Sequence, residues 1–119
     1  MELQFRPVKE GRKVAAWVQS LKGKSGVYLI AVRPGIAPVL DFPAIAYIGE
    51  SHSGTLYKTM LRHFQRWAGP TAGPTFKPAT VQVAVIITRP GRAVDIQDAL
   101  IAEHRPPLNT VAKPKGFFG

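Results

Sequence analysis

The chain contains no cysteine and has few acidic residues. The absence of cysteine excludes disulfides and cysteine-based zinc sites. Only 7 Asp and Glu accompany 16 Lys and Arg among 119 residues, which gives a formal net charge of +9 at pH 7. So large a positive excess on one ordinary domain predicts an anionic partner, most often nucleic acid, and the alternative is a solvated basic surface that only aids solubility.

Long hydrophobic runs are also missing. No apolar stretch approaches the roughly 20 residues that a membrane-spanning helix needs, and residues 1–9 lack the apolar core of a secretory signal. We therefore expect a cytoplasmic protein with no membrane partner. Hydrophobic residues still make up 45% of the chain, which is enough for a core, so we expect one domain over residues 1–112 and a basic tail over residues 113–119.

The spacing of apolar residues predicts three helices and three strands. Apolar residues at i, i+3, i+4 and i+7 indicate amphipathic helices, whereas β-rich and alternating runs indicate strands. The expected helices cover residues 10–22, 56–67 and 95–104, and the expected strands cover residues 26–33, 44–49 and 81–88.

The connections between these elements predict the topology. Only about ten proline-rich residues separate the first two strands, which is too few for a parallel crossover, so the pair should be antiparallel. Residues 69–78 are expected to form an irregular loop, Pro90-Gly91 to turn the chain, and Pro106-Pro107 to end the last helix. The expected fold is α+β, with a small three-stranded, mainly antiparallel sheet flanked by helices.

Two tyrosines lie beside glycines in the first two strands. They belong to the segments Gly-Val-Tyr at 26–28 and Tyr-Ile-Gly at 47–49. A tyrosine in a strand is usually a core residue. Because alternate residues share a strand face, Tyr47 is expected to lie on the same face as Ile45. Adjacent antiparallel strands could bring Tyr28 and Tyr47 into one pocket, but the register between the strands is left open.

Glu103 is the strongest candidate on the last helix. It follows Ala99 by four positions and Leu100 by three, so it is predicted to continue the core-facing stripe of the helix. A lone carboxylate in apolar surroundings is costly unless it is paired or binds a metal. Metal ligation, a structural ion pair and a glutamate at the edge of the stripe that reaches solvent all remain open.

The middle helix supplies a row of cations. Lys58, Arg62 and Arg66 are spaced at i, i+4 and i+8, so they are expected to lie along one face, with His63 beside Arg62. Such a row is usually a solvated face, although it can also bind phosphates. No pair of histidines has the helical spacing of a metal site, and no glycine-rich phosphate loop is present.

The order of these residues resembles the GIY-YIG nuclease family over residues 25–110. Each tripeptide alone is a weak signal, whereas the ordered set on matching elements is specific, and the family has the same α+β layout. The residues that carry the resemblance are Tyr28, Tyr47, Arg62, His63, Glu103 and Asn109.

The resemblance implies a role for each of these residues. Glu103 would hold one Mg²⁺ ion, with Mn²⁺ as an alternative, and Arg62 would contact the scissile phosphate. Tyr28 would assist deprotonation of the attacking water, and Tyr47 would orient that water or a phosphate oxygen. Asn109, a turn residue on its sequence alone, would help to order the site.

Three features depart from the family pattern or require tuning. Many members carry a His one helical turn after the Arg, where this chain has Arg66, so the counterpart here is either that position or the adjacent His63. Glu50 stands where members often have Lys or a small polar residue, and it is either a second acidic group near the metal or a surface ion-pair partner. Because a tyrosine with its ordinary pKa of about 10 is a poor base, cations and the metal are expected to lower the pKa of Tyr28.

These observations predict a metal-dependent endonuclease that hydrolyses DNA phosphodiester bonds, with RNA as the open alternative substrate. The residues expected to hold the nucleic-acid backbone are Lys58, Arg62, Arg66 and Lys77, and the expected state is a monomer or a homodimer. One alternative is a catalytically inactive, basic nucleic-acid-binding module of the same fold. Another is a protein-interaction domain that uses its basic face.

Overall fold

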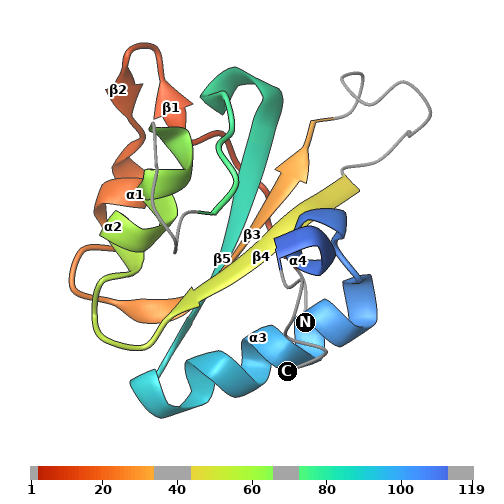
Figure 1. Ribbon diagram of the computed structural model, residues 1–119. Coiled ribbons are helices and arrows are strands. Elements are labelled where there is room, and N and C mark those ends of the chain that lie inside the picture. The colour runs from red at the N-terminus through yellow and green to blue at the C-terminus, as the bar shows by residue number, and fades with distance from the viewer. Residues whose placement is uncertain (1–2, 34–43, 66–72, 113–119) are drawn as a thin grey trace.

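The centre of the molecule is a three-stranded antiparallel sheet, seen in a computed structural model that describes residues 3–33, 44–65 and 73–112 (Figure 1). The strands are β3 (Ser25–Val32), β4 (Ala44–Ser51) and β5 (Val81–Thr88), in the order β4-β3-β5. β3 is buried along almost its whole length, as expected for a central strand with two apolar faces. The predicted α+β class and the antiparallel pairing of the first two strands are confirmed.

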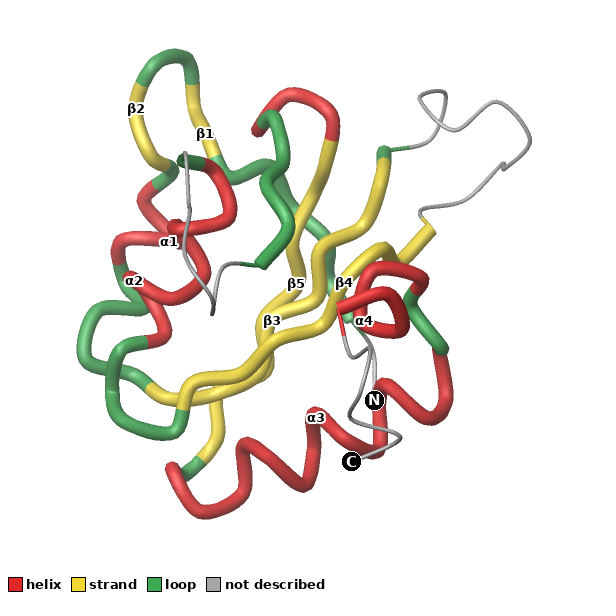
Figure 2. The backbone as a smooth tube through the Cα atoms, viewed as in Figure 1, coloured by secondary structure: helices red, strands yellow, loops and turns green. Residues whose placement is uncertain are grey.

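Helices cover both faces of this sheet, as Figure 2 shows. On one face lie α1 (Ala16–Gln19) and α2 (Leu56–Leu61), which continues into the 3₁₀ turn η1 (Arg62–Phe64). On the other face lies α3 (Pro90–His104), with the short α4 (Pro107–Ala112) beside β4. The core is therefore split into two apolar layers, one on each side of the sheet.

The expected helix over residues 10–22 is wrong. A small hairpin occupies its first half, formed by β1 (Lys9–Glu10) and β2 (Lys13–Val14), and only Ala16–Gln19 are helical. Gly11 turns the hairpin with a φ of +66°, a left-handed conformation that glycine adopts without steric cost and that a helix interior does not contain.

The boundaries of the later helices also differ from expectation. α2 ends at Leu61 rather than near residue 67, and residues 66–72 lie outside the described part of the chain. α3 begins at Pro90, so the predicted Pro90-Gly91 turn is wrong: a proline at the first helical position loses no hydrogen bond there. Arg105 ends α3 in a left-handed conformation, and Pro107 then starts α4, which was not expected from the sequence.

Two of the predicted segments cannot be compared with the structure. Residues 34–43, the proline-rich connection, and residues 113–119, the basic tail, lie outside the described residues. Before β5 the described chain forms a second 3₁₀ turn, η2 (Pro78–Thr80). None of the helices in the described ranges combines the length and the apolarity that crossing a bilayer requires.

Candidate active site

The register of the sheet brings the two tyrosines together. Tyr28 on β3 lies opposite Gly49 on β4, and Tyr47 on β4 lies opposite Ile30 on β3. The tyrosines are thus diagonal neighbours on one face, and their ring centroids are 6.3 Å apart. Both belong to the apolar layer beneath α1 and α2, where Tyr28 is 2% exposed and Tyr47 is partly buried.

Gly49 makes room for the ring of Tyr28. A β-carbon on Gly49 would collide with the ring and the hydroxyl of Tyr28, which lies directly across the ladder. Gly26 has a similar role at the start of β3, because a β-carbon there would collide with the carbonyl oxygen of Ile86 on β5. The glycines of the two tripeptides therefore serve close packing of strands and side chains.

A β-bulge sets the direction of Tyr47. The pairing of β3 with β4 shifts after Ile30, so that Ala31 lies opposite Ile45 and Ala46 is the extra residue. As a result, Ile45 packs in the layer beneath α3, whereas Tyr47 packs in the opposite layer. The expectation that these two residues share a face is wrong, because the bulge breaks the alternation.

His63 on η1 is fully buried and hydrogen-bonded at both ring nitrogens. Its Nε2 lies 2.8 Å from the Tyr28 hydroxyl oxygen, and its Nδ1 lies 2.7 Å from the carbonyl oxygen of Pro74. A carbonyl oxygen can only accept, so Nδ1 carries a proton and donates it. In the neutral imidazole Nε2 is then an acceptor, and the hydroxyl of Tyr28 donates to it. The His63 ring also lies 4.9 Å from the ring of Tyr47, centroid to centroid.

The pKa shifts of the cluster agree with a neutral Tyr28 that donates its hydrogen bond to a neutral His63. Burial raises the pKa of Tyr28 far above its ordinary value of about 10, the nearby Tyr47 and Glu50 raise it further, and Arg62 opposes them. Burial also raises the pKa of Tyr47 and lowers that of His63, where the hydrogen bond to Pro74 acts in the opposite direction. Among the described residues, Arg62 lowers the pKa of Tyr28 as expected, but desolvation outweighs it, so the net shift is upward.

The cations of α2 and η1 lie at the surface near this cluster. Arg62, the first residue of η1, is exposed and close enough to oppose the raised pKa of Tyr28. Lys58, one turn earlier, is exposed too, and both line a cavity of about 320 Å³. Arg66 lies outside the described residues, and Lys77 is exposed just before η2 and does not line this cavity.

Glu50 lies at the edge of the cluster. Its side chain is 17% exposed, and its carboxylate lies 3.0 Å from Nδ1 of His52, whose side chain is 62% exposed. Because Glu50 contributes to the raised pKa of Tyr28, it is an acidic neighbour of the cluster as well as a surface ion-pair partner.

Glu103 does not continue the core stripe of α3, so that expectation is wrong. Its side chain is 70% exposed, and its carboxylate contacts Nε2 of His104 at 3.6 Å. Buried Ala93 and the packed side chains of Leu100 and Ile101 mark the core-facing side, whereas Ala99 is exposed. The core-facing stripe of α3 is therefore rotated away from Glu103. Of the three alternatives left open by the sequence, the structure agrees with a glutamate at the edge of the stripe that reaches solvent.

Asn109 lies on α4 and is buried against β4. Its Oδ1 accepts from the backbone N–H of Ile48 at 2.7 Å, and its Nδ2 donates to the carbonyl of the same residue at 2.8 Å. Ile48 lies between Tyr47 and Gly49, so Asn109 fixes the strand segment that carries the second tyrosine.

A divalent metal ion at this site would need donor side chains from the chain. The described residues contain no group of three or more His, Asp or Glu side chains that could hold a metal ion. Mg²⁺, however, keeps several waters and is usually held by one or two carboxylates together with substrate phosphates. The exposed carboxylate of Glu103 fits that donor chemistry.

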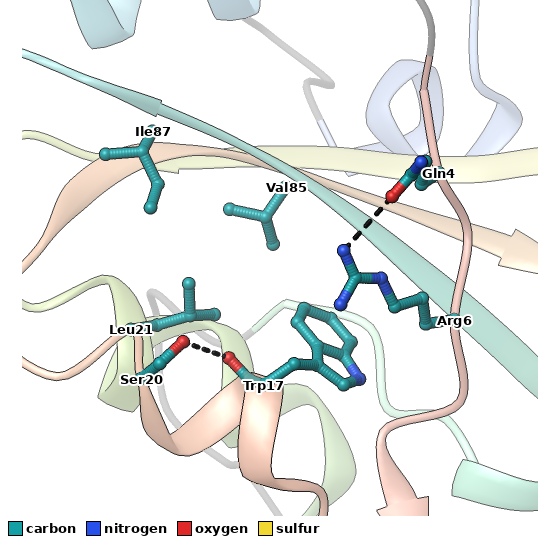
Figure 3. Close-up of a pocket in the computed structure, with 7 residues that line it drawn as sticks. All are labelled: Gln4, Arg6, Trp17, Ser20, Leu21, Val85 and Ile87. Carbon is teal, nitrogen blue, oxygen red and sulfur yellow. Dashed lines mark hydrogen bonds between the residues drawn. The ribbon is translucent and has the colours of Figure 1, made fainter.

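A separate cavity of about 280 Å³ lies between the N-terminal segment, α1 and β5 (Figure 3). Arg6 stacks over the ring of Trp17, with its guanidinium carbon 5.3 Å from the ring centroid, and donates to Gln4. The floor includes Ile87, which is 54% exposed. None of the residues predicted from the sequence to form the site lines this cavity.

The role of His63 was left open by the sequence. His63 follows buried Met60 by three positions, a helical spacing that places it on the core-facing stripe, and this was the available signal. The acceptor carbonyl of Pro74 comes from a loop and has no sequence signature. In comparisons with known proteins, no family model, no curated protein and no solved structure gave a significant match to this chain.

Proposed function

We propose that this chain is a GIY-YIG-type endonuclease that hydrolyses phosphodiester bonds of DNA with the help of one divalent cation. The observation that carries the proposal is the buried Tyr28–His63 hydrogen bond, which lies beside Tyr47 and beneath the exposed Arg62. Two aliphatic residues would stabilise an apolar core better than a buried Tyr–His pair, because the burial of polar groups costs free energy. The pair is therefore expected to have a role beyond packing. A proton-transfer pair beneath a cation is suited to the activation of water beside a phosphate.

The pair explains how a tyrosine with a raised pKa acts in hydrolysis. The Tyr28 hydroxyl donates to His63 and keeps a lone pair that can accept a hydrogen bond from a water molecule. As the water oxygen bonds to phosphorus, the bond from phosphorus to the 3′ oxygen breaks and the 3′ oxygen takes a proton from solvent. In the same step one water proton passes to Tyr28 while the proton of Tyr28 passes to Nε2 of His63. The carbonyl of Pro74 then holds the imidazolium. No free tyrosinate forms, so the raised pKa is no obstacle.

The remaining residues act on the phosphate and on the strand that carries it. Arg62 stabilises the charge that grows on the phosphate in the transition state, and the partly exposed Tyr47 orients the water or a phosphate oxygen. Lys58 and Lys77 hold neighbouring phosphates of the backbone. Asn109 keeps the tyrosine-bearing segment of β4 in place through Ile48.

Glu103 is the residue that would hold the cation, proposed as Mg²⁺ with Mn²⁺ as the alternative. When bound, the cation would supply neutralisation of negative charge on the phosphate and on the departing 3′ oxygen. The proposed working form is a monomer or a homodimer in the cytoplasm. DNA is the proposed substrate, and RNA is the alternative.

A second candidate is a nucleic-acid-binding module of the same fold without turnover. One observation favours it: Tyr28 is only 2% exposed, which limits the access of water to its hydroxyl. The net charge of +9 supports nucleic-acid binding in both cases.

A plasmid-nicking assay separates the two functions. The wild-type protein is expected to nick supercoiled DNA with Mg²⁺ or Mn²⁺ and to stop in EDTA. DNA binding without nicking under both metals would establish the module instead. A matched cleavage assay on a single-stranded RNA shows whether RNA is also a substrate.

A further inference from the structure

A second feature near Arg62 is a pair of cavities that both include Tyr57 in their lining. One, of about 320 Å³, is lined by Lys58 and Arg62 among others, and the next, of about 360 Å³, is lined by Lys22 and Thr55 among others. Tyr57 and Lys58 line both cavities. We call the two cavities together the Tyr57 groove.

The ring of Tyr57 is held in place within this groove. Its inner part packs against the apolar layer beneath α1 and α2, and the Lys22 ammonium lies 5.0 Å from its ring centroid. A ring that is already held in place loses little entropy when a ligand stacks on it, and a stacking base would take the place of the Lys22 ammonium at the ring face.

The groove floor next to Tyr57 is formed by two tied loops without side chains at their tips. Gly23 and Gly54 line the larger cavity, and both have a positive φ, +80° and +75°. The backbone N–H of Leu56 donates to the carbonyl of Lys24 at 3.0 Å, and that of Gly54 donates to the hydroxyl of Ser25 at 2.9 Å. These bonds hold the two loops together beside the cavity that Gly23 and Gly54 line.

The chemistry of the groove alternates cations with an aromatic ring. Lys22, Lys58 and Arg62 are placed around Tyr57, and single-stranded nucleic acids offer the complementary alternation of phosphates and unstacked bases. In a duplex the bases are paired and stacked on one another, so that only phosphates would reach the groove. We infer that the Tyr57 groove binds an unpaired stretch of nucleic acid, with one base stacked on Tyr57 and the flanking phosphates at Lys58 and Arg62.

This inference rests on the proposed function and sharpens its substrate class. Arg62 lines the groove and is the residue proposed to contact the scissile phosphate, so a strand in the groove leads directly to the candidate active site. The preferred substrate then has an unpaired base next to the cleaved bond, as in a flap, a gap or a loop. A continuous duplex would bind through its phosphates alone.

Fluorescence anisotropy in EDTA tests the inference without any cleavage. The probes are a labelled oligothymidylate, an abasic strand of equal length with the same phosphates, and a duplex of that length. The wild-type protein is expected to bind the oligothymidylate roughly 10-fold or more tightly than the abasic strand, since one base–aromatic stack is typically worth that much. Tyr57→Leu should reduce the affinity for the base-bearing strand to that for the abasic strand and leave abasic binding unchanged.

Three control variants separate stacking from charge and from folding. Tyr57→Phe keeps the ring, so it should keep the preference for bases. Trp17→Leu removes the aromatic ring that contacts Arg6 in the cavity of Figure 3, and it should leave the preference for base-bearing strands intact. Lys58→Met should weaken binding of both single strands by an equal factor. Thermal melts of each variant identify a loss of folding.

Each outcome supports or overturns the inference. Equal wild-type affinity for the base-bearing and abasic strands overturns it, and that comparison needs no variant. Equal losses on both strands in Tyr57→Leu overturn it as well. A base preference without nicking would leave the groove assignment standing while the endonuclease proposal fails, and nicking without a base preference would do the reverse.

Discussion

The two faces of the sheet are built from alternate residues of the same strands, yet they differ in chemistry. Beneath α3 the buried residues are aliphatic, Val27, Leu29, Ile48 and Ala84. Beneath α1 and α2 the core includes Tyr28, and fully buried His63 is bonded to it. Among the described residues no buried side-chain nitrogen or oxygen lacks a partner, so the polar face is satisfied as well as buried. We infer that the aliphatic face stabilises the sheet and that the polar face carries the proton-transfer pair, whereas the proposed metal ligand, Glu103, lies on α3 on the aliphatic side.

The largest effect is expected from a change at Glu103, which lies on α3 on the aliphatic side of the sheet. This effect would break the division between the two faces. Glu103→Gln should abolish nicking while DNA affinity and melting temperature stay close to wild type, since the side chain is 70% exposed and its neutral replacement has the same shape. Asp98→Asn, which neutralises another exposed acid of the same helix, is the matched control and should nick normally. Wild-type nicking by Glu103→Gln would remove Glu103 from the site and leave all chemistry on the polar face.

The next effect sharpens the contrast between the faces. Tyr28→Phe should lower the nicking rate roughly 100-fold or more at saturating Mg²⁺, because the ring stays and only the proton-transfer group is lost. It should also cost about 1–3 kcal/mol of unfolding free energy, because Nε2 of His63 loses its donor.

Ile48→Val on the aliphatic face is the control for this loss of stability. It should cost about 0.5–1.5 kcal/mol and leave the nicking rate of the folded protein unchanged. Rates and urea unfolding curves of the two variants give the comparison. An unchanged rate in Tyr28→Phe would make the pair a structural one.

A smaller effect concerns packing across the ladder. Gly49→Ala should destabilise the protein by about 1–3 kcal/mol, since its β-carbon would overlap the Tyr28 ring and force it to move. Gly91→Ala in α3 is the matched control: nothing lies near its β-carbon, so the change should be neutral or stabilise by up to about 1 kcal/mol. Equal melting temperatures for the two variants would contradict the close contact of Tyr28 with Gly49.

The smallest expected effect is the pH dependence of stability. Burial lowers the pKa of His63, so its contribution is fully present above the unfolded value of about 6.5 and is lost as pH falls below it. Burial raises the pKa of Tyr28, so its contribution is present below about pH 10 and is lost as pH rises above it. The free energy of unfolding, measured with urea at each pH across this range, should be constant near neutral pH and should fall at low pH. This fall should be less steep in His63→Gln. Parallel acid limbs for the two proteins would contradict a buried, neutral His63.

Much of the fold follows from local sequence signals, whereas the site depends on contacts that those signals do not encode. The short connection between the first two strands predicted their antiparallel pairing, and β-rich runs located all three strands of the main sheet. The β-bulge at Ala46 could not be predicted, because a register shift has no signature in either strand alone. The true orientation of Glu103 depends on where Ala93 and Ile101 pack, which is set by the tertiary structure. The hairpin before α1 was missed because Val14 and Trp17 match a helical stripe, although Gly11 offered a turn signal.

The clamp of Asn109 on β4 has a consequence for self-association. β4 is an edge strand, and the free peptide groups of such an edge can recruit a strand from another molecule. A carboxamide carries the same donor and acceptor as a peptide unit, and Asn109 offers both to Ile48, so one side chain stands in for a fourth strand at this position. A second copy of the chain could pair with Ile48 only after Asn109 had left these peptide groups. Asn109 therefore opposes strand addition at the same residue through which it steadies Tyr47.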